Sequence, residues 1–346
     1  MSSETLEVMA QSADSFVDMH ELQVNLGKRI AELTRNEAAY VVNSATGGML
    51  LAAAVALCRD DLYLFSRLPD VSEIPKNEMI IMRSQRNAYC ASVQASGAKI
   101  IEIGDADETL DWMLEGAINE RTAAIFYFPN KLYHRASMSL EKVIEIAKRN
   151  NILVIADAAS QLPPKENLWR YTEMGVDLAI FSGGKALNGP QSSGLILGRQ
   201  DLIDSCIRFG APVHGICRSC KASRESMVGV LAALETYLSM DHDEFNRELS
   251  EKTDKLVEII DSTGVLKGFR VEYGPAGQEY PRAFGTLPDS FSGSELMDAM
   301  RNEGIFIGYD KPQDCIFLNP LNLDYEEIEI VKTALIKCVA DMKATR

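Results

Sequence analysis

Short apolar runs alternate with longer segments of mixed polarity between about residue 40 and residue 200. Apolar runs that end at Gly, Pro or polar residues predict buried strands, and the longer segments predict helices. The predicted strands are 40–43, 79–82, 99–103, 123–128, 152–156, 178–181 and 194–197. The predicted helices among them are 49–57, 87–96, 110–119 and 140–149. This alternation predicts an α/β fold with a mostly parallel sheet and helices on both faces.

The pattern changes near residue 240, where a long helix predicted over 227–240 gives a candidate domain boundary. Beyond it the sequence predicts helices over 245–263 and 325–342 and short strands over 269–273 and 282–287. We therefore expect a large domain over residues 1–240, with an N-terminal helical arm, and a small α+β domain over residues 241–346.

Composition narrows the class of protein. The residues are 46% hydrophobic and 25% charged, as in a globular protein with a sizeable core. The net charge of −15 disfavours a nucleic-acid partner, because that affinity depends mostly on Lys and Arg. The N-terminus lacks the apolar core of a signal peptide, and the longest apolar stretch, 49–58, is shorter than the ~20 residues that span a bilayer. Seven scattered cysteines suit a reducing compartment. We expect a cytoplasmic protein without a membrane partner.

Two strand ends carry candidate chemistry. The predicted strand 178–181 stops at Ser182-Gly-Gly and delivers Lys185. Partial burial of a lysine favours the neutral amine, which attacks aldehydes. The predicted strand 152–156 ends on Asp157, whose carboxylate can pair with a protonated pyridine nitrogen. A pyridoxal-phosphate enzyme needs this arrangement at the carboxyl ends of neighbouring strands. The alternative is that Lys185 is a surface lysine after a glycine turn.

Several segments carry a family resemblance. The central ones are DAAS (157–160), PPKEN (163–167) and SGGKALNGPQSSGLILGR (182–199), and the match extends from about residue 16 to about residue 238. These segments resemble the selenocysteine-synthase-like (SelA-like) group of fold-type-I pyridoxal-phosphate enzymes, and within it the D-glucosaminate-6-phosphate ammonia-lyases. The resemblance implies pyridoxal 5'-phosphate as cofactor and Lys185 as the catalytic residue. It also implies a homodimer or higher homo-oligomer with active sites near the interface, to which residues 191–193 are candidate contributors.

The segment 44–48, Ser-Ala-Thr-Gly-Gly, is the expected phosphate site. Gly47 and Gly48 let the backbone approach an anion, a helix N-terminus supplies amide hydrogens, and the Thr46 hydroxyl can donate as well. The alternative is an ordinary strand-to-helix turn with a capping side chain. The remaining expected cofactor contacts are Ser182, Ala159 and Gln85.

Candidate substrate contacts come from two loops. Gln85, Arg86 and Tyr89 follow a strand end, where this fold offers a group to cover the outer face of the cofactor ring. His214 and Arg218 lie in a later loop, in which the resemblance implies an arginine that holds an anionic part of the substrate, as suits a guanidinium. Arg86 and Arg282 are alternatives for that role.

Two regions depart from the family pattern. Residues 217–221 read Cys-Arg-Ser-Cys-Lys where the family has Gly-Arg-Pro-Met-Lys, and Asn319 stands where relatives often have an arginine. Cys217 and Cys220 have the spacing of metal or redox pairs, but no second pair or histidine cluster completes a metal site. We expect no metal.

The resemblance implies a lyase. Its substrate would be a sugar-derived 2-amino-3-hydroxy acid, with or without a phosphate, which loses water and ammonia to give a 2-keto acid. The same cofactor also serves β-replacement, racemisation and retro-aldol cleavage. Selenium transfer onto a seryl-tRNA is disfavoured by the charge of −15. A catalytically impaired cofactor-binding homologue is the third alternative, because of Asn319 and because relatives carry an additional N-terminal stretch.

Overall fold

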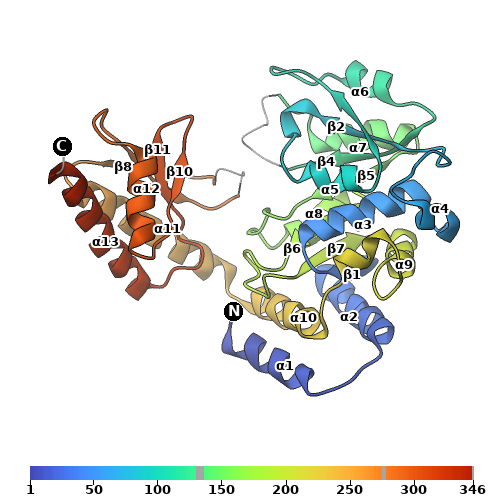
Figure 1. The fold of residues 1–346 in the computed structure, drawn as a ribbon, viewed down its shortest axis with the longest axis horizontal. Coiled ribbons are helices and arrows are strands. Elements are labelled where there is room, and N and C mark those ends of the chain that lie inside the picture. The colour runs from blue at the N-terminus through green and yellow to red at the C-terminus, as the bar shows by residue number, and fades with distance from the viewer. Residues whose placement is uncertain (130–135, 275–277, 345–346) are drawn as a thin grey trace. The chain divides into compact units, whose positions relative to one another are not determined.

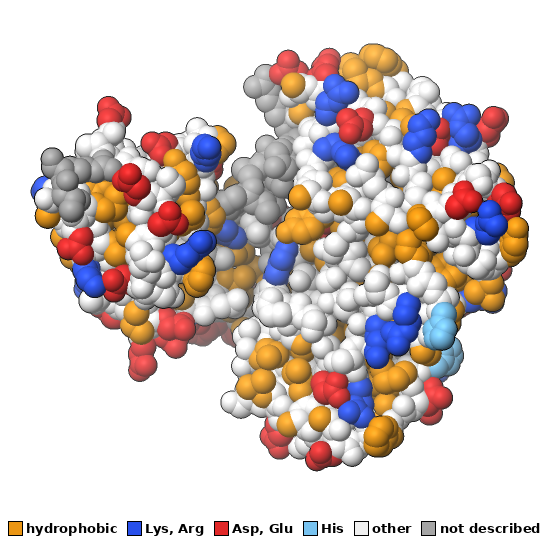
Figure 2. Space-filling view, in the orientation of Figure 1, with side chains coloured by type: hydrophobic (Ala, Val, Ile, Leu, Met, Phe, Trp, Pro, Cys, Tyr) orange, Lys and Arg blue, Asp and Glu red, His pale blue; other side chains and the backbone are white. Residues whose placement is uncertain are grey.

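The computed structural model describes residues 1–129, 136–274 and 278–344, which belong to two compact units, residues 1–239 and 240–346 (Figure 1). Each unit has its own sheet and its own hydrophobic core. Acidic and basic side chains are interspersed over the face seen in Figure 2. Among the described residues, no helix has the length and apolar character needed to cross a membrane.

The first unit is built on a seven-stranded sheet in the order β1-β7-β6-β5-β4-β2-β3. Its neighbours pair in parallel except β7, which runs antiparallel to both β1 and β6. The strands are β1 (Ala38–Val42), β2 (Glu78–Met82), β3 (Lys99–Ile103), β4 (Thr122–Tyr127), β5 (Leu153–Asp157), β6 (Leu178–Ser182) and β7 (Gly194–Gly198). All seven predicted strands are present. Except in the edge strand β3, their residues are almost all buried, which explains the continuous apolar runs.

Helices cover both faces of this sheet. Helix α3 (Ala45–Cys58) is buried along nearly its whole length and packs on the face to which Ile180 and Ile196 point. Helix α8 (Asn167–Met174) packs on the other face, where its Tyr171 ring lies 6.4 Å from the Phe181 ring between centroids. Helix α7 (Leu140–Arg149) packs on β5 through an apolar stripe. The predicted three-layer arrangement is therefore correct.

The observed helices differ in their bounds from the predicted ones where a side chain caps the first turn or where the helix is short and polar. Helix α3 begins at Ala45 rather than Met49, because the Ser44 side chain accepts a hydrogen bond from Gly47 N and caps the first turn. The helix predicted over 87–96 is reduced to α5 (Cys90–Ala95), which follows a 3-10 turn at Arg83–Gln85. The other helices of this unit are α1 (Ser3–Ala13), α2 (Met19–Thr34), α4 (Leu62–Arg67), α6 (Asp111–Ala117), α9 (Gln200–Phe209) and α10 (Arg224–Ser239).

The second unit has a four-stranded antiparallel sheet in the order β10-β11-β9-β8. Its strands are β8 (Lys267–Val271), β9 (Arg282–Thr286), β10 (Gly308–Asp310) and β11 (Cys315–Leu318). Helices α11 (His242–Ser262), α12 (Gly293–Asn302) and α13 (Tyr325–Ala344) contribute to its core. The sequence pattern predicts β8 and β9 but misses β10 and β11, which have only three and four residues.

A buried carboxylate ties three neighbouring strands together at their amino ends. Glu78 opens β2 and is 2% exposed. Its Oε1 accepts hydrogen bonds from Lys99 Nζ at 3.2 Å and Arg121 Nε at 2.9 Å, and its Oε2 accepts one from Asn119 Nδ2 at 2.9 Å. The hydrogen bond from Asn119, supported by the two cations, outweighs burial and lowers the pKa of Glu78 to about 2. This network aligns the start of β2 with the starts of β3 and β4.

Replacing Glu78 by Gln should destabilise the fold by on the order of 2 kcal/mol at pH 7, because two cations lose their buried partner. The native pKa of Glu78 lies below its unfolded value of 4.5. The contribution of the carboxylate is therefore complete above about pH 4.5 and is lost as the pH falls toward 2. Urea unfolding of wild type and variant between pH 7 and pH 3 measures this; the two curves should converge at low pH. Glu120→Gln, at an exposed position in the same turn, is the matched control. Equal stability of wild type and Glu78→Gln at pH 7 would contradict the assignment.

Candidate active site

The carboxyl ends of β1, β5 and β6 meet at one edge of the large sheet. Asp157 at the end of β5 is paired with Ile180 of β6. Gly194, the first residue of β7, is paired with Ser182 on one side and with Val42 on the other. Because neighbouring strands lie about 4.8 Å apart, the ends of β1 and β6 are roughly 10 Å apart across Gly194. The turn into α3, Ser182 and Asp157 therefore share this edge.

Backbone hydrogen bonds hold the loop that carries Lys185. Gly183 N donates to Ser193 O at 3.0 Å, and Asn188 N donates to Lys185 O at 2.9 Å. The Gln191 side chain closes the loop, because its Nε2 donates to Gly184 O at 2.9 Å. The residues 183–193 thus fold back on the end of β6, which fixes the position from which the Lys185 side chain leaves the sheet.

The Lys185 amine lies in a polar cluster at the end of β5. Its Nζ donates to Ser160 Oγ at 2.6 Å. Although part of the side chain reaches solvent, burial by the surrounding atoms lowers the pKa of Lys185, and the charge of Asp157 acts in the opposite direction. Burial raises the pKa of Asp157, while the Ala159 N–H, which donates to Asp157 Oδ1 at 3.1 Å, and the Lys185 charge both oppose that shift. A less basic amine thus lies within electrostatic reach of a desolvated carboxyl group.

Ser160 is the residue of this cluster that the sequence analysis did not single out. It lies in the segment 157–160 that carries the family resemblance, but nothing in that segment indicates which atom it meets. The contact with Lys185 joins positions 25 residues apart, so only the fold brings them together.

The N-terminus of α3 opens at the same edge. Ser44 is the N-cap residue, and its Oγ accepts from Gly47 N at 3.0 Å. The amides of Ala45 and Thr46 have no acceptor within the helix, because the first turn of a helix lacks them. Thr46 is exposed there, and Gly48 is buried against Ile180 and Ile196. A side chain at Gly194 would lie 2.7 Å from the Ser44 carbonyl carbon and 2.8 Å from Ala45 N, so glycine allows β7 to start directly beneath this turn.

The residues that follow β2 differ in their surroundings. Gln85 is buried, and its Oε1 accepts from Phe128 N at 2.9 Å, which anchors it to the end of β4. Arg86 forms an ion pair with Glu102 at 3.1 Å, although its Nη1 has no hydrogen-bond partner among the described residues. Tyr89 is 57% exposed and starts α5. Of these three, Tyr89 has the accessible ring, and the charge of Arg86 is already balanced.

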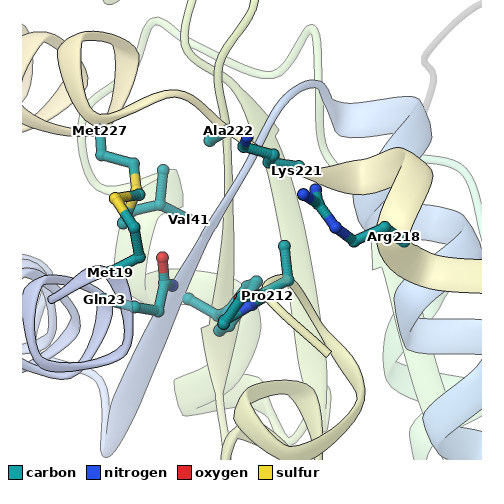
Figure 3. Close-up of a pocket in the computed structure, with 10 residues that line it drawn as sticks. Met19, Gln23, Val41, Pro212, Arg218, Lys221, Ala222 and Met227 are labelled. Atoms are coloured by element: carbon teal, nitrogen blue, oxygen red, sulfur yellow. The ribbon is translucent and has the colours of Figure 1, made fainter. Parts of the chain in front are cut away.

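Arg218 lines a cavity on the outer side of β1 (Figure 3). Arg218 belongs to a 3-10 helix, Ile216–Cys220, rather than to an open loop. This helix is bonded to the residue before the α3 turn, since Asn43 N donates to Cys220 O at 3.1 Å and Asn43 Nδ2 donates to Ser219 O at 2.8 Å. The cavity has a volume of about 190 Å³, and Lys221 lines it together with Arg218.

A buried amide without a partner faces the same cavity. Gln23 of α2 is 4% exposed and lies opposite Arg218 in Figure 3. Its Nε2 has no hydrogen-bond partner among the described residues. Neither Arg218 nor Lys221 forms an ion pair within the described part of the chain. Two unpaired cations and an unsatisfied donor give this cavity the chemistry of an anion site.

The other candidates of this loop have plain surroundings. His214 is exposed. Cys217 and Cys220 are buried and hydrogen-bonded to each other, and this contact raises the pKa of Cys217 and lowers that of Cys220. Over residues 1–129, 136–274 and 278–344, no group of three or more His, Cys, Asp or Glu side chains is arranged to hold a metal ion.

The edge that carries Lys185 fits pyridoxal phosphate. The amine with a lowered pKa suits an aldehyde, and the desolvated Asp157 suits a pyridinium nitrogen. The free amides of α3, with Gly194 beneath them, form a cradle for the phosphate that a Cβ atom at position 194 would obstruct. All three groups lie at one edge of one sheet.

Comparison with known proteins agrees with this geometry. The chain is 33% identical over 244 residues to a D-glucosaminate-6-phosphate ammonia lyase of Salmonella typhimurium, an alignment that covers 68% of this chain and 63% of that protein. It is 29% identical over 345 residues to a 5'-C-glycyluridine monooxygenase-decarboxylase of a Streptomyces species, which covers 97% of this chain and 82% of the relative. The first alignment thus spans less than two thirds of the ammonia lyase.

Solved structures confirm the predicted fold class. A structure of D-glucosaminate-6-phosphate ammonia-lyase superposes with a TM-score of 0.80 at 26% identity and covers 99% of this chain and 92% of that one. The neighbours are fold-type-I pyridoxal-phosphate enzymes, as expected from the α/β large sheet and the small antiparallel sheet. The family model of SelA, L-seryl-tRNA selenium transferase, matches residues 19–250. Because that match covers more than half of the chain, the protein belongs to the SelA family.

Proposed function

We propose that the chain is a pyridoxal-phosphate-dependent lyase that converts a 2-amino-3-hydroxy acid into a 2-keto acid and ammonia. The observation that carries the proposal is that a less basic Lys185 amine and the Asp157 carboxyl share the sheet edge where the α3 turn opens. The likeness to an ammonia lyase at 33% identity supports the choice of reaction.

Each residue of the edge has a role in this proposal. Lys185 Nζ would hold the cofactor through its aldehyde and would serve as the base for the proton on the substrate Cα. Ser160 Oγ, 2.6 Å from that nitrogen, orients the amine. Asp157 keeps the pyridine nitrogen protonated, and the free amides of α3 with the Thr46 hydroxyl hold the phosphate. Pyridoxal phosphate, when bound, supplies the electron sink for charge that develops at the substrate Cα. Loss of the β-hydroxyl as water and hydrolysis of the resulting enamine then give the keto acid and ammonia.

We also propose that the substrate is an acidic sugar derivative, of the class named by the ammonia lyase relative. The cavity of Arg218 and Lys221 supports this, because its two unpaired cations suit a carboxylate or phosphate. We also propose a homodimer or higher homo-oligomer, which membership of the SelA family supports. Of the segment proposed to contribute across the interface, Gln191 and Ser192 are exposed, whereas Ser193 is buried and its Oγ donates to Pro190 O at 2.6 Å.

A second candidate is oxidative decarboxylation of an amino acid. The observation that favours it is the relative named 5'-C-glycyluridine monooxygenase-decarboxylase, whose alignment runs over 97% of this chain. The same groups around Lys185 serve both reactions, so the products distinguish them.

Incubation with pyridoxal phosphate and a panel of 2-amino-3-hydroxy acids, including D-glucosaminate and its 6-phosphate, should release keto acid and ammonia in equal amounts. Lys185→Ala is the inactive control, because it removes the base at the substrate Cα. Carbon dioxide release with oxygen uptake on an amino acid would support the second candidate instead. If no amino acid gives either set of products, the proposal of a lyase is wrong.

Borohydride should fix pyridoxal phosphate to Lys185, and peptide mass spectrometry should find the label there. Asp157→Asn should be labelled as fully, but its turnover should fall roughly 100-fold or more, since an amide cannot keep the pyridine nitrogen protonated.

The direction of the pKa shift of Lys185 gives a further check. Asp157 raises the pKa of Lys185, so in apo Asp157→Asn the amine should become reactive toward acetic anhydride at lower pH than in wild type. Label on another lysine, or an unchanged acylation profile, would overturn these assignments.

Arg218→Ala should raise KM steeply and lower kcat/KM roughly 30- to 150-fold, equivalent to about 2–3 kcal/mol, while cofactor binding survives. The loss reflects an anionic substrate group left without its guanidinium partner. Arg86→Ala and Arg282→Ala test the alternatives, and Arg208→Ala is a control because that side chain reaches Asp60 on the surface. If Arg218→Ala leaves kcat/KM unchanged while Arg86→Ala or Arg282→Ala lowers it, the assignment moves to that arginine.

A further inference from the structure

A larger cavity lies at the opposite edge of the same sheet. Its volume is about 460 Å³, and it is lined by the start of β5, the turn after α7, the end of α3 and the residues that flank β6 and β7. Leu153 and Val154 line it, whereas Asp157 of the candidate active site ends the same strand. Since a strand rises about 3.3 Å per residue, Leu153 and Asp157 are roughly 13 Å apart. The cavity is therefore separate from the edge that carries Lys185.

Three cations and one carboxylate line this cavity: Arg59, Lys148, Arg199 and Asp177. Both oxygens of this carboxylate already accept hydrogen bonds within the fold. Asp177 Oδ1 accepts from Arg199 Nη1 at 2.7 Å, and Asp177 Oδ2 accepts from Val154 N at 2.7 Å. The remaining nitrogens of Arg199, Nε and Nη2, donate to Asp201 at 3.0 and 2.7 Å. Arg199 and Asp177 thus satisfy each other and leave the other two cations without a partner.

Arg59 and Lys148 have no hydrogen-bond or ion-pair partner for their charges among the residues that the structure describes. The acidic residues next to Arg59 are engaged elsewhere. Asp60 lies 4.0 Å from Arg208, and Asp61 Oδ1 accepts from the backbone amides of Tyr63 and Leu64 at the start of α4. Burial lowers the pKa of Arg59, and the nearby charge of Arg199 lowers it further, while the charges of Asp177 and Asp201 act in the opposite direction. An anion in the cavity would add to the effect of these two carboxylates.

The backbone holds Arg59 at some conformational cost. Arg59 follows the last turn of α3 with φ of +57° and ψ of −102°, a conformation that L residues adopt rarely and glycine adopts easily. Such strain persists where the surrounding structure compensates for it and is often found at ligand sites. The backbone conformation of Arg59 not only ends α3 but also places the guanidinium at the lining of the cavity.

Gly175 makes room for the second cation. It ends α8 with φ of +115°, and a Cβ atom there would lie 2.6 Å from Lys148 Nζ and 2.9 Å from Lys148 Cε. The Lys148 side chain therefore lies over the glycine, at the lining of the cavity. Ile144, Ala147 and Ile152 add an apolar wall beside the two cations.

We propose that this cavity binds a small organic phosphate, with the phosphate between Arg59 and Lys148 and the carbon skeleton against the apolar wall. A phosphate monoester carries about −1.5 to −2 charges at neutral pH, which matches two unpaired cations better than a single carboxylate does. The volume suits a sugar phosphate, because small-molecule sites usually measure about 300–1,000 Å³. The ligand would lie outside the reaction site, on a chain whose overall charge of −15 otherwise repels anions.

Ribose 5-phosphate is a suitable probe, used on the full chain loaded with pyridoxal phosphate and reduced with borohydride so that the α3 turn is filled. The probe should slow acylation of Lys148 by acetic anhydride at least 3-fold, read by peptide mass spectrometry, and should bind in calorimetry. Arg59→Gly combined with Lys148→Gln should weaken binding at least 10-fold. Lys142→Gln, on the same helix but paired with Glu145 at 2.9 Å, should bind as wild type does.

Arg59→Gly also shows whether the loss is a folding defect. Because glycine suits the backbone at this position, that single variant should melt at or about 2 °C above the wild-type temperature and still bind the probe more weakly. The proposal fails if Lys148 is not protected, if the double variant binds as tightly as wild type, or if succinate protects Lys148 while ribose 5-phosphate does not. If borohydride leaves no label on the chain, the proposed reaction is wrong, but Lys148 protection in the unlabelled protein still tests this site.

Discussion

The double pairing of Gly194 is the constraint on which the candidate active site depends. By running antiparallel between two parallel strands, β7 starts where β1 and β6 end, so its first residue lies between Val42 and Ser182. Any side chain there would meet the first turn of α3. The turn into α3 and the lysine loop, about 140 residues apart in sequence, are brought together by this one strand. A shift of the register by one residue would turn every side chain of β7 to the opposite face of the sheet.

The polar groups that the sheet positions are of two kinds, which differ in whether their charges and hydrogen bonds are satisfied within the fold. At the carboxyl edge, burial lowers the pKa of Lys185 and raises that of Asp157, and each group favours the charged form of the other. At the amino edge, the carboxylates Glu78 and Asp177 are neutralised by basic side chains and serve as joints between strands. The contrast is between polar groups that are satisfied within the fold and groups such as Gln23 Nε2, Arg218 and Arg59 that are not. These three groups line cavities, where a ligand can complete them.

The sequence predicts the large sheet well because its strands are buried on both faces and appear as unbroken apolar runs. The ends of these apolar runs also predict that Lys185 and Asp157 lie at strand ends. Short elements and helix ends are harder to predict from apolar runs. Strands β10 and β11 are too short to show a period in the sequence. The capping hydrogen bond of Ser44 moves the start of α3 by four residues. Contacts such as Ser160 with Lys185, or Gln85 with Phe128, join distant segments and have no local signal. The cationic cavity of Arg59 and Lys148 is hidden in sequence for the same reason.

The outer strand β3 limits how this protein can associate. Lys99 and Glu102 are exposed on it, and Glu102 is bridged to Arg86 while Lys99 reaches back to Glu78. Charged side chains along an open edge discourage another strand from adding its backbone hydrogen bonds there. At the other end of the sheet, α2 packs against β1. A second copy of the chain therefore cannot easily add a strand to the large sheet. Charge blocks this addition at β3, and a helix hinders it at β1. Such edge-to-edge addition is the route toward fibrous aggregates. Association of copies through the borders of the large sheet is therefore disfavoured.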